Sequence, residues 1–279
     1  MKNAFKLTIL CITFFLGISS LESCMQAFKM NDASILKYYT EKPPLPAFSY
    51  TDTLGYKIHY AHSKSDSLKS VLLLIHGAPG AWFGYKDFFN DKEILNRFEV
   101  IAPDRSGYNK SNGNLTDITL HAQAISPLFS LKSQSKYTVV GRSYGAAIAA
   151  KLVVEHPSRV DRLILVAPAC DPTKEKFWWF SKPVNTKFVR FFLPKYANRA
   201  SDEKFAHPES LRKLLPDWQK IKCPVTILQG GKDWIIEPSN GHFVDSVLKN
   251  APRRLFLLPQ NGHLLTEERF DLVKQILLE

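Results

Sequence analysis

Short apolar runs alternate with polar, glycine-rich segments along most of the chain from about residue 57 onward. Most of these runs are continuously apolar, which is typical of strands buried on both faces of a sheet. Helix-like segments follow most of them, and this alternation predicts a mostly parallel sheet joined by right-handed crossovers. The predicted strands are 57–60, 71–75, 98–102, 137–140, 162–167, 224–229 and 254–258.

Helical patterns lie between several of the predicted strands. They cover 82–89, 114–132, 146–154 and 263–278. Pro127 is expected to break or kink the second of these helices, because proline lacks the amide hydrogen and clashes with the preceding turn. The alternation stops after the strand that ends at Ala167, and the next strand starts at Pro224. This gap is too long for an ordinary loop, so we interpret 170–222 as a small helical lid inserted into the core domain.

The predicted lid is rich in aromatic residues that lie among lysines. We expect these rings to face the core domain and to line a pocket, with Trp178 and Trp179 in contact with a substrate. The alternative is that the rings pack only among themselves, as aromatic residues of a core usually do.

The start of the chain has the pattern of a secretory signal peptide. A positively charged beginning precedes 15 residues without charge, 7–21, fewer than the roughly 20 that a membrane-spanning helix needs. Small residues then lead to Cys24, as in a bacterial lipoprotein signal, in which a cysteine after the cleavage point receives lipid. We therefore expect a signal peptide over 1–23, an anchor on Cys24 on the periplasmic or cell-surface side of a membrane, and a tether or extended N-terminal arm over 24–50. A plain signal peptide with Cys24 incidental is the alternative.

Composition places the rest of the chain among globular proteins. Hydrophobic residues make up 45% and charged residues 23% of the 279 residues, which is enough to bury a large core. The net charge is +11, and between Asp171 and Lys222 there are 12 basic against 6 acidic residues. A basic face suits solubility, anionic lipid headgroups or an acidic substrate. The basic residues are dispersed and match no nucleic-acid motif, so nucleic acid is not an expected partner.

The cysteines and histidines lack the spacing of a zinc site, so no structural metal is predicted. Cys170 and Cys223 flank the predicted lid. They either form one disulfide in an oxidising compartment or remain two free buried thiols, because spacing alone does not fix the distance between them.

The most informative motif is Gly141-Arg142-Ser143-Tyr144-Gly145. It joins the apolar run 137–140 to a helical pattern, and in that context a Gly-x-Ser-x-Gly sequence predicts a sharp turn that exposes the serine. Small neighbours are needed because the chain folds tightly on itself. Ser143 at the start of a helix would lie beside free backbone N–H groups that stabilise an oxyanion. The plain alternative is an ordinary glycine-rich turn with a surface serine.

Four further motifs, taken with this turn, resemble those of the α/β-hydrolase fold family from about Thr51 onward. His76-Gly77-Ala78-Pro79 resembles its oxyanion loop, and Pro103-Asp104-Arg105-Ser106-Gly107-Tyr108 resembles a turn of the family, although Asn109 stands near the place of a second glycine. Gly231-Lys232-Asp233 and Asn261-Gly262-His263 resemble its acid and base turns. The resemblance implies an α/β fold with a mostly parallel sheet, in two parts, 51–169 and 223–279, around the lid.

The resemblance implies a catalytic triad of Ser143, His263 and Asp233, which occur in the order Ser, Asp, His that this fold uses. A serine hydroxyl needs an adjacent base, histidine supplies it, and a carboxylate orients the imidazole. Asp171 and the weaker Glu237 are the alternative acids. The alternative bases are His76, His207 and His242, of which His76 is expected to brace the oxyanion loop.

The oxyanion hole is expected to use the backbone N–H groups of Tyr144 and Ala78. The triad implies no cofactor. A serine at position 143 argues against the relatives that use an aspartate nucleophile, the haloalkane dehalogenases and epoxide hydrolases. Arg142 is unusual beside the nucleophile; it either pairs with a core acid such as Asp104 or reaches the pocket and favours a substrate carboxylate.

The predicted function is that of an exported serine hydrolase that cleaves the carboxylic ester of a small molecule through an acyl-enzyme intermediate. Three alternatives remain open from the sequence. The same triad hydrolyses amide, peptide or carbon–carbon bonds in other members of the fold, since fold does not select the reaction. A noncatalytic binding protein of this fold is the second. The third is a role for the basic, aromatic lid in membrane contact.

Overall fold

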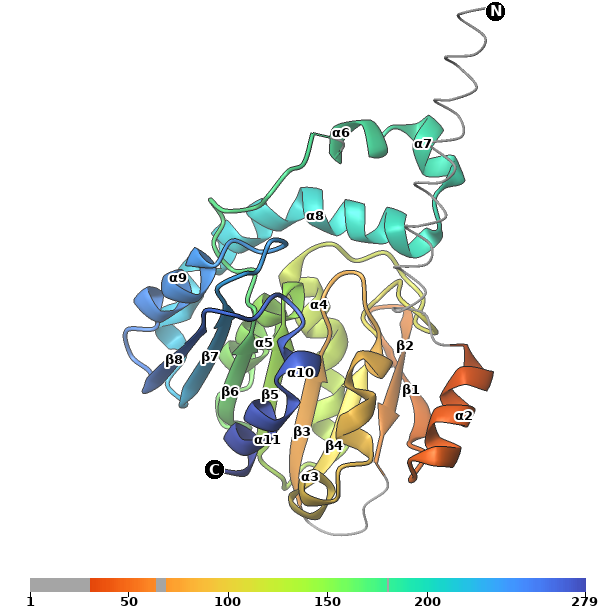
Figure 1. Ribbon diagram of the computed structural model, residues 1–279, viewed down its shortest axis with the longest axis vertical. Helices are drawn as coiled ribbons and strands as arrows, with labels where there is room; N and C mark the ends of the chain where they lie inside the picture. Colours follow the sequence, from red (N-terminus) through yellow and green to blue (C-terminus); the bar gives the residue numbers. More distant parts are fainter. Residues whose placement is uncertain (1–30, 64–68, 180) are drawn as a thin grey trace, which may run out of the picture.

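The protein is described by a computed structural model that covers residues 31–63, 69–179 and 181–279. Its strands are β1 (Ala47–Thr53), β2 (Tyr56–His62), β3 (Ser70–Ile75), β4 (Phe98–Pro103), β5 (Tyr137–Arg142), β6 (Val160–Val166), β7 (Val225–Gly230) and β8 (Arg253–Leu258). They form one eight-stranded sheet in the order β1-β2-β4-β3-β5-β6-β7-β8 (Figure 1). The pairs β1–β2 and β2–β4 are antiparallel and the others are parallel. The prediction of a mostly parallel sheet flanked by helices is confirmed.

Helices cover both faces of this sheet (Figure 1). They are α2 (Asp32–Glu41), η1 (Trp82–Phe89), α3 (Lys92–Arg97), α4 (Ile118–Ile125), η2 (Ser126–Ser130), α5 (Tyr144–Glu155), α9 (Ser239–Val247), α10 (Leu265–Glu268) and α11 (Phe270–Leu278). The predicted break at Pro127 is confirmed, since α4 ends at Ile125 and η2 begins one residue before the proline. The helix expected over 263–278 is instead two helices, because Arg269 has non-helical φ and ψ of −130° and 40°.

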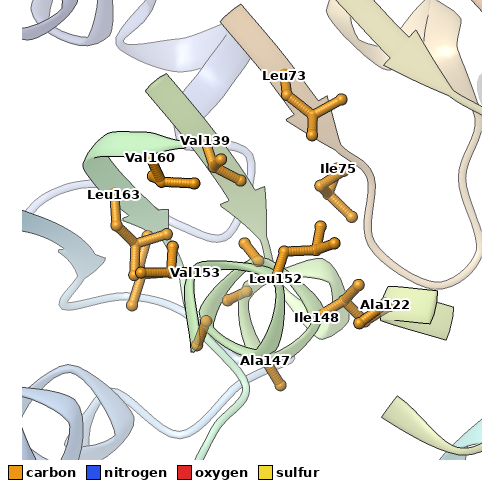
Figure 2. Packing of buried hydrophobic residues seen from close by; sticks show 14 of the residues in the cluster. Leu73, Ile75, Ala122, Val139, Ala147, Ile148, Leu152, Val153, Val160 and Leu163 are labelled. Carbon is orange, nitrogen blue, oxygen red and sulfur yellow. The ribbon is translucent and has the colours of Figure 1, made fainter. Parts of the chain in front are cut away.

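Two apolar cores lie on opposite faces of the sheet. One joins the strands to α4, α5 and α9, and the other joins them to η1, α3 and α11. Figure 2 shows the first of these, with Ile148 and Leu152 of α5 beside Ile75 of β3 and Val139 of β5. All four side chains are fully buried. The strand that leads into Ser143 and the helix that follows it are therefore held in place by close packing.

The expectation of a tether or an extended arm over 24–50 is wrong for residues 32–41, which are helical. Residues 32–41 form α2, which buries Ile35 and Tyr39 one turn apart on a single face. The next element, β1, pairs along its whole length with β2. Its burial alternates between half-buried and exposed residues, as at the edge of a sheet, so it lacks a clear apolar run. The predicted signal peptide and Cys24 lie outside the described residues.

The segment between β6 and β7 is helical in its described residues. It contains α6 (Ser181–Val184), α7 (Lys187–Phe192), α8 (Lys195–Leu214) and η3 (Leu215–Lys220). In Figure 1 these helices, except η3, form a layer above the sheet. Trp218 of η3 is buried in the core beside α5, so this ring belongs to the main body and not to a lid pocket.

The thiols of Cys170 and Cys223 are both free, which decides between the two states that the sequence left open. Burial raises the pKa of Cys170 well above its usual value and that of Cys223 to about 11. Within 31–63, 69–179 and 181–279, no helix has both the length and the apolar character to span a bilayer.

Candidate active site

Ser143 lies between β5 and α5 in a strained backbone conformation, with φ 54° and ψ −123°. Non-glycine residues rarely adopt positive φ, and such strain is concentrated at functional sites. The flanking glycines permit it. A Cβ on Gly145 would lie 2.4 Å from the carbonyl oxygen of Ile75, and one on Gly141 would lie 2.6 Å from the Cβ of Ala149. The turn therefore requires glycine at both positions, and the predicted sharp turn at Ser143 is confirmed.

Asp233 and His263 are brought together. The Nδ1 of His263 lies 2.7 Å from Oδ2 of Asp233. The other oxygen, Oδ1, accepts hydrogen bonds from the backbone N–H groups of Ile235 at 3.0 Å and Ile236 at 2.8 Å. These bonds fix the carboxylate so that one oxygen is left to orient the imidazole.

Strand pairing explains why the two turns meet. Parallel β7 and β8 end side by side, with Gly230 opposite Leu258. A Cβ on Gly230 would lie only 2.1 Å from the carbonyl oxygen of Gly262, so glycine allows the turn after β8 to cross closely over the end of β7. The backbone N–H of Lys232 donates to the carbonyl of Asn261 at 3.0 Å, which joins the acid turn to the base turn.

Arg142 connects the serine turn to the segment after His263. Its Nη1 donates to Thr266 at 2.8 Å and to Glu267 at 2.5 Å, while its side chain is almost fully buried. The expected pairing with Asp104 is wrong, because the acidic partner of Arg142 is Glu267. The guanidinium is committed to this contact rather than to a substrate. Within the described residues, no hydrogen bond joins Ser143 to His263. The Arg142 bonds instead join the serine turn to α10, which follows the base turn.

Tyr144 and Ala78, the residues expected to supply the oxyanion hole, both line the pocket that contains Ser143. Tyr144 is the first residue of α5, so its N–H has no acceptor within the helix. Ala78 lines the same pocket as Ser143. The loop approaches closely, because a Cβ on Gly77 would lie 3.0 Å from the Cβ of Ser143.

His76 braces this loop and is neutral. Its Nδ1–H donates to the carbonyl of Gly77 at 2.7 Å, and its Nε2 accepts the backbone N–H of Arg105 at 2.9 Å. Burial lowers the pKa of His76 well below its usual value, and the Arg105 charge adds to this shift. Both nitrogens are thus occupied, which leaves His76 unsuited to act as the base.

A pocket of about 390 Å³ contains Ser143, Ala78 and Tyr144. Most of its other lining residues are apolar, and they include Ala169, Trp178, Val184, Phe205, Ile235 and Ile236. Trp178 is placed as the sequence predicts. Trp179 does not line this pocket as far as the described residues define it, and its side chain is 86% exposed. A second hollow, of about 450 Å³, lies beyond the oxyanion loop and does not include Ser143.

A buried ionic network joins the lid to the oxyanion loop, and the sequence motifs did not reveal it. Glu203 of α8 and Arg105 are both fully buried and form two hydrogen bonds of 2.6 and 3.0 Å. The same guanidinium donates to the carbonyls of His76 at 3.0 Å and Gly77 at 2.9 Å. The hydroxyl of Tyr108 and the imidazole of His121 also contact Glu203, at 2.7 and 3.0 Å.

Burial alone would raise the pKa of Glu203, but Arg105 and His121 together lower it below its usual value. The carboxylate is therefore charged within the protein interior. In the sequence, Arg199, Glu203 and His207 recur every four residues on one face of a helix. That spacing was the available signal, but charged residues at such a spacing usually face solvent.

The alternative acids and bases contact other partners, although His207 lines the same pocket as Ser143. Asp171 accepts from the backbone N–H and hydroxyl of Thr173, and Glu237 pairs with Lys176. His207 contacts Glu175 at 2.7 Å and stacks on the ring of Tyr144. The exposed His242 makes no printed contact with Asp233 or Ser143 among the described side chains.

The arrangement is a strained serine at a strand–helix turn, with a hydrogen-bonded aspartate and histidine that follow the ends of the neighbouring strands β7 and β8. No group of three or more histidine, cysteine, aspartate or glutamate side chains in the described parts of the chain is placed to hold a metal ion. The fold and site together define a class of protein, the hydrolases built on an α/β sheet.

Comparison with known proteins agrees with this class. The profile described as "alpha/beta hydrolase fold" matches residues 70–209, half of the chain. The chain therefore belongs to the α/β-hydrolase fold family. An uncharacterized protein of Mycobacterium tuberculosis is 30% identical over 127 residues, 44% of this chain and 35% of that protein. Epoxide hydrolase 1 of Caenorhabditis elegans is 29% identical over 115 residues, 39% of this chain and 27% of that protein. The chain spans about a third of the length of the curated relatives that it matches.

Solved structures share the fold over most of the chain. A membrane phospholipase A, described as a bacterial virulence factor, has a TM-score of 0.67 and 21% identity, with 97% of this chain and 96% of that chain covered. An esterase from Exiguobacterium antarcticum has a TM-score of 0.64 and 19% identity, with 82% and 97% covered. The structural neighbours thus include esterases and a phospholipase.

Proposed function

We propose that this chain is an exported serine hydrolase that cleaves the carboxylic ester of a small molecule through an acyl-enzyme intermediate. The proposal includes a lipid anchor on Cys24, for which the support is the pattern of the sequence around that residue. Ser143 is the nucleophile, His263 the general base and acid, and Asp233 the residue that orients His263.

The observation that carries the proposal is the 2.7 Å contact between His263 and Asp233 at the sheet edge where Ser143 is strained. With Nδ1–H donated to Asp233, the Nε2 of His263 is the nitrogen available to take a proton. The Arg142 bonds to Thr266 and Glu267 hold the start of α10, which directly follows His263, against the serine turn. The hydrogen bond between a nucleophile and its base is often long in the free enzyme and shortens when substrate binds.

In the proposed reaction, Oγ of Ser143 attacks the ester carbonyl carbon while Nε2 of His263 takes its proton. The N–H groups of Tyr144 and Ala78 stabilise the resulting oxyanion. The carbon–oxygen bond to the alcohol then breaks, and His263 returns the proton to the leaving alcohol. Water attacks the acyl-enzyme with the same base, releases the carboxylic acid and restores Ser143.

The pocket favours an apolar acyl group. Its lining includes Ala169, Val184, Phe205 and Ile235, with the polar Glu175, Lys204 and His207 in the minority. Burial of apolar surface against such walls contributes roughly 25 cal/mol per Å². The volume of about 390 Å³ fits a small substrate.

The test is a fluorophosphonate probe together with turnover of soluble nitrophenyl esters. Wild-type protein should be labelled at Ser143, and Ser143→Ala should lose labelling and up to roughly 10⁶-fold in turnover with its fold intact. Ser246→Ala is the matched control, because that exposed hydroxyl only bonds the carbonyl of Phe243. Near-normal hydrolysis by Ser143→Ala would remove the proposal. A severe loss in Asp233→Asn with a normal Asp171→Asn identifies the acid.

A further inference from the structure

The outer helix of the lid, α7, carries an exposed aromatic face. Its residues Phe188, Phe191 and Phe192 are 76%, 82% and 59% exposed, and none of the helix is buried. Their spacing of three and four residues places them on one side of the helix. Ring centroids of Phe192 lie 5.5 Å from those of Phe188 and 5.2 Å from those of Phe191. A contiguous exposed apolar face of this kind marks an interaction site.

Positive charge flanks this aromatic face along the chain. Between residues 181 and 195 the chain has Lys182, Lys187, Arg190 and Lys195 and no acidic residue. The three lysines are exposed, and none forms an ion pair with a residue in the described part of the chain. Aromatic rings bordered by uncompensated lysines complement a surface that is apolar inside and anionic outside. An anionic lipid bilayer has this chemistry.

The lid holds α7 in a defined orientation. Arg190 forms two hydrogen bonds with Asp202 of α8, at 2.6 and 3.0 Å, and its backbone carbonyl accepts from Asn198 at 2.8 Å. Figure 1 shows α7 at the outer end of the lid, beyond α8 and away from the sheet. The aromatic face is therefore presented outward from the body of the protein.

The same segment reaches the pocket that contains Ser143. Trp178, Ser181 and Val184 line that pocket, and Val184 is separated from α7 by only two residues. A surface that binds α7 would consequently lie next to residues that border the pocket. Docking would bring lipid-soluble esters close to the site.

We propose that the aromatic face of α7 docks on an anionic lipid bilayer, with Phe188, Phe191 and Phe192 inserted at the level of the headgroups and the lysines against phosphates. Docking itself does not depend on the reaction; its value for presenting esters rests on the proposed function. The absence of acidic residues in 181–195 favours lipid over a second copy of this basic chain, which like charges would repel.

The test places an environment-sensitive nitrobenzoxadiazole label at Phe191→Cys in the full chain, with Cys11, Cys24 and Cys223 replaced by serine and the buried Cys170 retained. Leu257→Cys, on β8 outside the lid and 47% exposed, carries the matched reference label. Vesicles of phosphatidylcholine and phosphatidylglycerol at 3:1 should shift emission to the blue at position 191 and leave position 257 unchanged. Pure phosphatidylcholine should give a weaker shift.

An unchanged signal at position 191, or equal signals at both positions, overturns the proposal. So does a shift that follows protein concentration without vesicles, which would indicate self-association. The triple variant Phe188→Ser, Phe191→Ser and Phe192→Ser should bind these vesicles roughly tenfold or more weakly and keep its turnover of soluble esters. If the wild-type protein does not hydrolyse soluble esters, that result counts against the proposed function and not against docking, because the label reports docking without catalysis.

Discussion

At the scale of single residues, Arg105 does more than its place in a turn motif suggests. It pairs with Glu203 of the lid and donates to the two carbonyls of the oxyanion loop, at His76 and Gly77. One buried cation therefore sets the position of both the loop and α8. A buried ion pair is weak evidence for stability when intact, but removing one partner is strongly destabilising. The role of this ion pair is to fix the positions of the oxyanion loop and α8.

The variant Glu203→Gln tests this role. It leaves the Arg105 charge buried without a counter-ion, so the free energy of unfolding should fall by about 3 kcal/mol or more. Soluble-ester turnover should fall as well, because the oxyanion loop loses its support. Glu209→Gln on the same helix is the control: that side chain is exposed and pairs with Arg212 at 3.2 Å, so its effect should stay below about 1 kcal/mol. Urea unfolding of both variants measures the difference. Equal, small losses would show that the network is not needed.

At the scale of elements, the junction from β5 to α5 is the most constrained part of the fold. The strand is buried along its length, and the helix buries nearly all of its first three turns. Gly145 lets α5 pass directly against the end of β3, at the carbonyls of Ile75 and His76. This close approach fixes the positions of both Ser143 and the first N–H groups of α5.

Gly145→Ala should therefore be severe. The new Cβ would lie 2.4 Å from a backbone oxygen that has no flexible end to move aside. We expect a loss of several kcal/mol in unfolding free energy, at the upper end for point substitutions. Gly84→Ala is the matched control, because its Cβ would meet only the Arg142 side chain at 3.5 Å, an ordinary contact. Thermal unfolding compares them, and a mild Gly145→Ala would contradict this account of the turn.

At the scale of the whole molecule, two buried, neutral histidines take part in the contacts that join the core to the lid. His76 is the first residue of the oxyanion loop and bonds the carbonyl of Gly77, and His121 of α4 donates to Glu203 of the lid. Burial lowers the pKa of both rings, although Glu203 opposes the shift at His121. Protonation of either ring would disturb contacts that join the lid to the core.

Stability should consequently depend on pH below neutrality. Because the folded pKa values are lowered, the unfolded chain binds more protons below about pH 6.5, so the histidine contribution is present above that pH and is lost as the pH falls. Each ring contributes up to about 1.4 kcal/mol per pH unit. His121→Gln keeps a donor for Glu203 and removes one titrating group, so its urea midpoint should fall less between pH 7 and 5.5. His242→Gln, at an exposed position, should keep the wild-type slope. If the urea midpoint falls equally with pH in the wild type and in both variants, the buried-histidine explanation is contradicted.

The sequence alone determined the strand order along the chain, the turn at Ser143 and the candidates Asp233 and His263. These depend on local signals: apolar runs, glycines at tight turns and residues directly after strands. The edge strand β1 was missed because an edge position leaves its apolar pattern weak.

Only the tertiary structure decided the pairing of Arg105 with Glu203, of Arg142 with Glu267, and the outward direction of Phe188, Phe191 and Phe192. The two pairs join residues 98 and 125 positions apart. No local pattern distinguishes an arginine that will be buried against a distant carboxylate from one that will face water. The direction of α7 likewise depends on how Arg190 fastens it to α8. Such contacts follow from packing, which brings together distant segments. The local sequence of one segment does not predict which other segment it will contact.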